Sequence, residues 1–341
     1  MWLSNSSVGR KFVMALTGTC LVLFVTFHCL MNSIAILWPT AYNVICEFLG
    51  ANWYALVASA GLALLVIIHI VYAVILTVQN RLARGSERYA VSKTPKSVEW
   101  SSKNMLVLGL VIAAFFVVHL IQFWAKMQLA EITGAEGSVP PAAGTIFLQM
   151  AFSQIWTPIV YIIGFVALWF HLNHGFWSMF QSIGLDNHVW IPRLKKIGCA
   201  WTSIVILLFV VQVGVFTYRA HDNYYLKDAD LRDQYKNMVW SMMEKEFSDA
   251  SQLEFNIKMS PYSQVAMGLR NMEQQQRQQF EQLNTPEGKE YVKNNPQMQE
   301  NVKNLEGQIK ALENVVKFFD YLEQADNKPE SEIPGITGQS K

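Results

Sequence analysis

Cysteine and charge are both scarce in this chain. Its four cysteines form neither a C-x-x-C nor a C-x-x-C-H motif, so nothing supports an iron–sulfur cluster or covalently attached haem. Small buried apolar residues are the simpler role for these thiols. A Gly-rich nucleotide fingerprint is also absent, which leaves no motif for a flavin nucleotide. The cysteines are Cys20, Cys29, Cys46 and Cys199.

Charged residues make up 16% of the 341 residues, against 52% hydrophobic residues, and they are unevenly distributed. Residues 1–218 contain 12 Lys and Arg against 6 Asp and Glu, whereas residues 219–341 contain 15 against 20. This contrast predicts a membrane domain over residues 1–218 and an acidic extramembrane helical domain over residues 219–325. The polar residues 326–341 are expected to form a disordered tail.

Five segments are apolar over the length of about 20 residues that a helix needs to cross a hydrocarbon core of about 30 Å. The first is longer than the apolar run of a signal peptide, so we expect it to be retained. The expected fold class is therefore all-α, a five-helix transmembrane bundle with a soluble helical extension. The segments are residues 12–37, 54–79, 104–127, 155–181 and 197–218.

Positive charge is concentrated in the second and fourth connections between these segments. Because positively charged loops stay on the cytoplasmic side, we expect a cytoplasmic N-terminus and a C-terminal domain on the outer side. The cations are Arg81, Arg84, Arg88, Lys93, Lys96 and Lys103 in the second connection, and Arg193, Lys195 and Lys196 in the fourth.

One histidine lies slightly off the centre of each of the first four segments: His28, His69, His119 and His171. An ionisable side chain in lipid is costly and needs a partner. Successive helices run in opposite directions and rise about 1.5 Å per residue, which places His28 and His119 toward the outer face and His69 and His171 toward the inner face. The two layers predict two haems, each held by one pair. Bis-histidine ligation leaves no open iron position, so such haems would carry electrons.

Four glycines lie at the complementary depths. Gly18 and Gly109 reach the depth of the inner pair, and Gly61 and Gly164 reach that of the outer pair. Small residues allow close approach to a helix, so these positions are expected to make room for the flat porphyrins.

Two other interpretations of the histidines remain open. Membrane histidines also serve as hydrogen-bonded interior residues or proton carriers, which would suit a haem-free transporter. His174, three residues after His171, is the runner-up for that ligand position. Zinc fits less well, because its sites favour several ligands close together.

The order of motifs resembles that of a known family. The motifs are L-T-G before F-H-C-L-M-N, then I-I-H-I-V-Y, V-V-H-L and F-H-L-N-H-G-F-W-S, one group in each of the first four segments. Together they resemble the single-chain, five-helix dihaem cytochrome b anchor of succinate dehydrogenases and fumarate reductases. The resemblance covers roughly residues 5–218, and family members end near the fifth helix.

The resemblance implies that His28, His69, His119 and His171 are the axial ligands of two b haems. It implies a bacterial cytoplasmic membrane, a flavoprotein and an iron–sulfur subunit on the cytoplasmic side, and electron exchange with a membrane quinone, menaquinone rather than ubiquinone. The dicarboxylate chemistry would lie on those other chains. The analogy also allows a dimer of the complex, and no nucleic acid is expected. A dihaem cytochrome b of another quinone-linked complex is the alternative.

The resemblance also suggests residues for the quinone. Glu47 occupies a place comparable to that of a glutamate that handles quinol protons in relatives, and a carboxylate is suited to such a relay. A solvated acid is the simpler interpretation. Asn32, one turn after His28, is a weaker candidate for the same pocket. Trp169 stands where some fumarate reductases have a glutamate proposed to conduct protons, which puts that path in doubt here.

The extension shows helical periodicity in residues 227–250, 261–283 and 296–325, punctuated by Pro261, Pro286 and Pro296. We expect these helices to cap the outer haem, bind a partner or simply stabilise the chain. The predicted apolar face of the last helix comprises Leu305, Ile309, Leu312, Val315, Val316, Phe319 and Leu322.

Overall fold

The structure is a computed structural model that describes residues 6–84, 100–134, 137–185, 187–247 and 250–327. Of the described residues, 87% are helical and none lies in a strand, which confirms the all-α prediction. Arg88, Lys93, Lys96 and residues 328–341 of the predicted tail lie outside the described residues.

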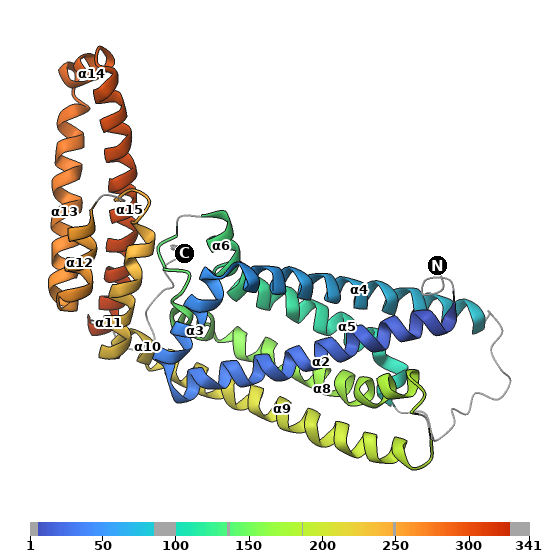
Figure 1. Cartoon of the computed structure of the whole chain (residues 1–341). Helices are drawn as coiled ribbons and strands as arrows, with labels where there is room; N and C mark the ends of the chain where they lie inside the picture. The colour runs from blue at the N-terminus through green and yellow to red at the C-terminus, as the bar shows by residue number, and fades with distance from the viewer. Residues whose placement is uncertain (1–5, 85–99, 135–136, 186, 248–249, 328–341) are drawn as a thin grey trace. The chain divides into compact units, whose positions relative to one another are not determined.

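Five helices within the described residues are long and apolar enough to cross a membrane, as predicted. Each extends beyond at least one of the expected ends, because polar and aromatic residues continue the helix past the apolar run. They are α2 (Ser7–Leu37), α4 (Trp53–Arg84), α5 (Trp100–His119) continued by the π-helix η1 (Leu120–Trp124), α8 (Trp156–Ser182) and α9 (Trp190–His221), which run along one another in Figure 1.

The surface of these helices has the polarity expected in lipid. None of the side chains of α4 is buried within the protein, and Leu64, Ile67 and Val71 are among those that are exposed. In contrast, polar side chains such as Gln122 and Gln212 are buried. Since water would penalise such a large apolar surface, the five helices indicate a membrane-spanning protein.

The contacts divide the chain into two compact units. One comprises Met1–Leu37, Ala51–Gln122 and Gln154–Val215, and the other comprises Trp38–Gly50, Phe123–Ser153 and Phe216–Lys341. The second unit thus joins the C-terminal segment to the connections that follow the first and third spans. Sequence analysis had placed both connections in the membrane domain.

The two connections contain helices that the sequence analysis did not predict: α3 (Pro39–Ala51), α6 (Gln128–Thr133) and α7 (Gly144–Phe152). α7 is almost entirely buried and has no side-chain cap of its own at its first residue. The fully buried Asn43 of α3 supplies one, since its Oδ1 accepts hydrogen bonds from the Thr145 backbone N–H and hydroxyl, both at 2.9 Å.

Asn43 also connects α3 to the C-terminal segment. Its Nδ2 donates to Gln234 Oε1 at 2.9 Å, and Gln234 donates back to the Thr40 carbonyl. The Thr145 hydroxyl lies 2.7 Å from that of Tyr235, whose pKa is raised by burial. Polar groups from three separate chain segments therefore satisfy one another in the interior of the second unit.

Gly144 allows α7 to approach α3 closely. A Cβ at this position would lie 2.5 Å from Cys46 Sγ and 2.8 Å from Tyr42 Cε1. Real side chains do not pack at such distances, so the close contact between these helices requires glycine.

The remaining helices follow the predicted order, with one difference. α13 (Tyr262–Leu283) and α15 (Pro296–Asn327) confirm two of the expected stretches, joined by α14 (Pro286–Lys293). Residues 227–250 are shorter pieces rather than one helix: α10 (Tyr224–Lys227), α11 (Ala229–Met238) and the 3₁₀ turn η2 (Val239–Met242), before α12 (Ser251–Met259). α15 includes the first two residues of the predicted tail. Its predicted apolar face is buried except for the half-buried Val316.

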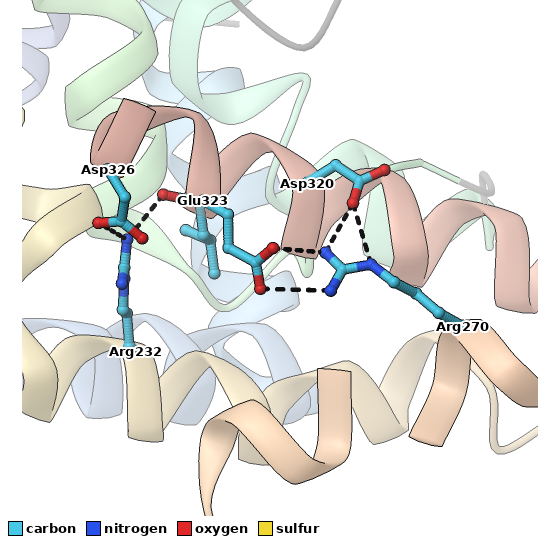
Figure 2. A network of polar contacts seen from close by, with 6 residues as sticks. Arg232, Arg270, Asp320, Glu323 and Asp326 are labelled. Carbon is cyan, nitrogen blue, oxygen red and sulfur yellow. Dashed lines mark hydrogen bonds and ion pairs between the residues drawn. The ribbon is translucent and has the colours of Figure 1, made fainter. Parts of the chain in front are cut away.

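Ion pairs connect α11 and α13 to α15, as Figure 2 shows. Arg270 reaches Asp320 and Glu323, both at 2.7 Å. Arg232 reaches Asp326 at 2.9 Å and donates to the Leu322 carbonyl. Since these side chains are partly exposed, solvent screens the attraction between their charges. Much of the stabilisation therefore comes from the hydrogen bonds between them.

Replacing Arg270 with Met should therefore destabilise the full chain by only about 1 kcal/mol. The loss should shrink in high salt, because screening already weakens the pair. Denaturant unfolding at two salt concentrations measures both effects, with Lys303→Met on the exposed face of α15 as the control. A loss that is independent of salt would contradict an electrostatic origin.

Candidate functional site

The four membrane histidines meet in two pairs within the first unit. His28 of α2 and His119 at the end of α5 have ring centroids 5.7 Å apart, with an angle of 89° between the ring planes. His69 of α4 and His171 of α8 have centroids 6.4 Å apart and an angle of 63°. The structure thus brings together the two pairs that the sequence predicts, whereas haem ligation stays a prediction.

The spacing of each pair fits two axial ligands of one iron. A metal–imidazole bond of about 2 Å on each side places the two ring centroids about 6 Å apart. The observed separations of 5.7 and 6.4 Å lie on either side of this value. Among the described residues no group of three or more His, Cys, Asp or Glu could hold a metal ion.

Aromatic rings surround the His28–His119 pair. Phe24 stacks on His28 at 5.4 Å, and Phe209 lies 6.3 Å from the same ring. Phe115 and Tyr161 each lie 6.0 Å from the His119 ring. These side chains come from four helices and give the pair an aromatic surrounding.

One histidine of each pair has a hydroxyl oxygen beside its Nδ1. The Tyr161 hydroxyl lies 3.1 Å from His119 Nδ1, and the Thr17 hydroxyl lies 3.1 Å from His69 Nδ1. The other two histidines differ: Asn32 Nδ2 lies 3.3 Å from His28 Nε2, and the buried Nδ1 of His171 has no hydrogen-bond partner among the described residues.

Two of the four predicted glycines can be placed at their expected depths. A Cβ on Gly18 would lie 3.8 Å from His69 Cε1, which puts Gly18 beside the His69–His171 pair as predicted. Gly164 lies against Phe115, the ring that contacts His119 of the His28–His119 pair. A Cβ added to Gly61 or Gly109 would meet no atom of the described residues within 4 Å, so their role stays a prediction.

Replacing Gly164 with Ala should disturb the His28–His119 pair selectively. The added Cβ would lie 2.5 Å from Phe115 Cγ, so the Phe115 ring must move against His119. If this pair holds a haem, as the sequence predicts, we expect loss or an altered spectrum of that haem, measured by haem content and low-temperature optical spectra. Gly214→Ala, where an added Cβ would meet no described atom within 4 Å, is the control. An unchanged spectrum in Gly164→Ala would argue against this packing.

The candidate quinone residues are less clearly supported. Glu47 is exposed on α3, within a helix rather than a loop, and belongs to the second unit. Asn32 donates to the His28 carbonyl at 2.8 Å in addition to its contact with the imidazole. Its amide is therefore engaged with His28 itself, and both quinone roles stay predictions.

The structure favours His171 over His174 as the partner of His69. The His174 ring packs against Trp177 at 4.9 Å, whereas His171 is the ring that faces His69. Trp169 donates its indole N–H to the Ser203 hydroxyl at 3.1 Å. All four cysteines are free thiols.

Sequence reasoning missed Tyr161, Thr17 and Gln122. Gln122 follows His119 by three residues, a spacing that puts both on one helix face and could have drawn attention to it. Tyr161 and Thr17 reach the histidines from neighbouring helices, so only the packing identifies them.

Neither the known family models, nor the curated proteins, nor the solved structures contain a match to this chain.

Proposed function

We propose that this chain is a membrane-anchor cytochrome b that carries electrons through two bis-histidine haems. The observation that carries the proposal is the presence of two separate histidine pairs, each with the ring spacing of two axial ligands, inside five apolar helices. His28 and His119 would hold one haem, and His69 and His171 the other. Bound in this way, haem supplies reversible one-electron chemistry with no open iron position.

The protein's part is to hold, orient and isolate the two groups. Each pair draws its ligands from two helices, so helix packing fixes the distance between the ligands. The phenylalanines around His28 and His119 would give one group an apolar surrounding. Gly18, beside His69, precedes His28 by ten residues, so the two pairs are separated by about 15 Å along α2. Such an arrangement would provide two steps for electron transfer across the membrane.

The motif resemblance leads us to propose the complex as well. The chain would join a flavoprotein and an iron–sulfur subunit of a succinate dehydrogenase or fumarate reductase and exchange electrons with a quinone, with menaquinone preferred. Those subunits would bind on the cytoplasmic face of a bacterial membrane, with residues 219–327 on the opposite face. Glu47 is the proposed proton relay for the quinone.

Purification of the full chain from its native membrane tests this proposal. We expect a b-type band in the reduced-minus-oxidised spectrum, two haems per chain, and copurification of a flavoprotein with an iron–sulfur protein. Absence of a b-type band would refute the haem assignment and favour buried histidines that carry protons. Two haems with different partner subunits would support a dihaem cytochrome b and assign it to another quinone-linked complex.

A further inference from the structure

The two hydroxyl groups beside the histidine pairs, those of Tyr161 and Thr17, donate their protons to acceptors other than the histidines. The Tyr161 hydroxyl donates to Gln122 Oε1 at 3.0 Å. The Gln122 amide is oriented by its other end, because Nε2 donates to the Thr157 hydroxyl at 3.1 Å. A carbonyl oxygen only accepts, so the single phenolic proton points at Gln122. The Tyr161 oxygen is therefore left to accept a hydrogen bond from His119 Nδ1.

The Thr17 oxygen is also left to accept a hydrogen bond from a histidine, because its proton is donated to its own helix. The Thr17 hydroxyl donates to the Val13 carbonyl at 2.9 Å and lies 3.2 Å from the Met14 carbonyl, both in its own helix. These carbonyls can only accept, so the Thr17 proton is held within α2. Its oxygen accepts a hydrogen bond from His69 Nδ1, which lies 3.1 Å away.

Both arrangements select one tautomer of a neutral imidazole. With the proton on Nδ1, the lone pair is on Nε2, the nitrogen that remains free for a metal. A hydrogen bond from the second nitrogen also fixes the ring orientation and makes the ligand more basic. Tyr161, Gln122, Thr157 and Thr17 are all buried, so water does not compete for these contacts.

The π-helix η1 contributes to the first arrangement. It begins at the residue after His119 and contains Gln122. π-turns change the direction in which side chains leave a helix and recur at functional sites. Here the π-helix contains Gln122, which is buried. The Gln122 side-chain carbonyl oxygen then accepts the hydrogen bond of the Tyr161 hydroxyl.

Resting on the proposed function, we infer that Tyr161 and Thr17 are positioning residues, each of which holds one axial histidine of one haem in the Nδ1-protonated tautomer. Their partners lack this device: His28 contacts Asn32 through Nε2, and the Nδ1 of His171 has no partner among the described residues. Each pair therefore has one histidine with a hydroxyl oxygen beside its Nδ1 and one without such a contact among the described residues.

The variants Tyr161→Phe and Thr17→Val test this inference in the full chain. Each removes the acceptor oxygen and keeps nearly the same shape. A less basic ligand stabilises ferric iron less, so the midpoint potential of one haem should rise in each variant. Tyr161→Phe should move only the haem of His28 and His119, and Thr17→Val only that of His69 and His171. Potentiometric titration and the low-spin ferric electron paramagnetic resonance signals measure both changes.

Matched variants separate an effect on the ligand from an effect on folding. Thr77→Val removes a hydroxyl that makes the same bond to the carbonyl four residues earlier, to Ala73, and Tyr54→Phe removes a phenol at the exposed start of α4. Both should leave the potentials unchanged, and Thr17→Ser, which retains a hydroxyl, should restore the wild-type value.

The outcomes also distinguish this inference from the proposed function. Wild-type protein without haem would overturn the proposed function. Two haems in the wild type, with unchanged potentials and resonance signals in both variants, would overturn the inference alone. Loss of only the matched haem, rescued by Thr17→Ser in the case of Thr17, would support it. Loss of both haems from either variant would show a general structural role and count against it.

Discussion

Under the proposed function, replacing His69 with Ala should leave the full chain with one haem rather than two. His69 faces His171 and no other histidine of the four, so its removal takes away one ligand of a single pair. The His28–His119 pair, built on α2 and α5, retains both imidazoles. Haem content per chain and the low-temperature reduced spectrum measure the result.

The pairing makes this expectation sharper when all four alanine variants are compared. His69→Ala and His171→Ala should lose the same haem and retain the same residual spectrum, while His28→Ala and His119→Ala should show the complementary spectrum. His174→Ala, which removes the neighbouring imidazole that packs on Trp177, should keep both haems. If His69→Ala and His28→Ala gave one and the same residual spectrum, the pairs would not be the ligand sets.

Replacing Asn43 with Ala should destabilise the second unit by about 2 to 3 kcal/mol, since a buried polar group left unpaired costs about 1 to 3 kcal/mol and a lost helix cap about 1 kcal/mol. The variant would leave the Thr145 backbone N–H and the Gln234 side-chain carbonyl oxygen without the partner that Asn43 supplies. It would also uncap α7, which has no cap of its own.

Denaturant unfolding and the rate of proteolysis in residues 216–327 measure this loss. Asn301→Ala, on the exposed face of α15, is the matched control and should have little effect. Wild-type resistance to protease in Asn43→Ala would mean that α3 and α7 do not support the C-terminal helices. The histidine pairs lie in the other unit, so haem content should change less than proteolysis does.

Much of the fold follows from local composition. Long apolar runs specify membrane helices because lipid penalises exposed polar groups, and this alone located all five spans. The proline positions and the apolar periodicity located α13 and α15 for the same kind of local reason. The prediction of one helix over residues 227–250 was wrong, because apolar periodicity does not reveal where a chain turns to pack against other segments.

The connections after the first and third spans show the same limit. Pro39 at the first position of α3 was an available signal for a helix start, but nothing local indicated that Asn43 would cap α7. That contact joins residues 102 positions apart in the chain. Membership of these segments in the C-terminal unit is consequently a property of packing.

The sequence by itself determined the five spans, the one histidine in each of the first four, and the sorting of those histidines into two depths. Depth is readable because a helix advances by a constant rise per residue and successive spans reverse direction. Only the tertiary structure decided which way each imidazole faces and which hydroxyl stands beside its Nδ1. Rotation about the helix axis and the choice of neighbours depend on side chains from several helices packing together, so Tyr161 and Thr17 became visible only in the folded chain.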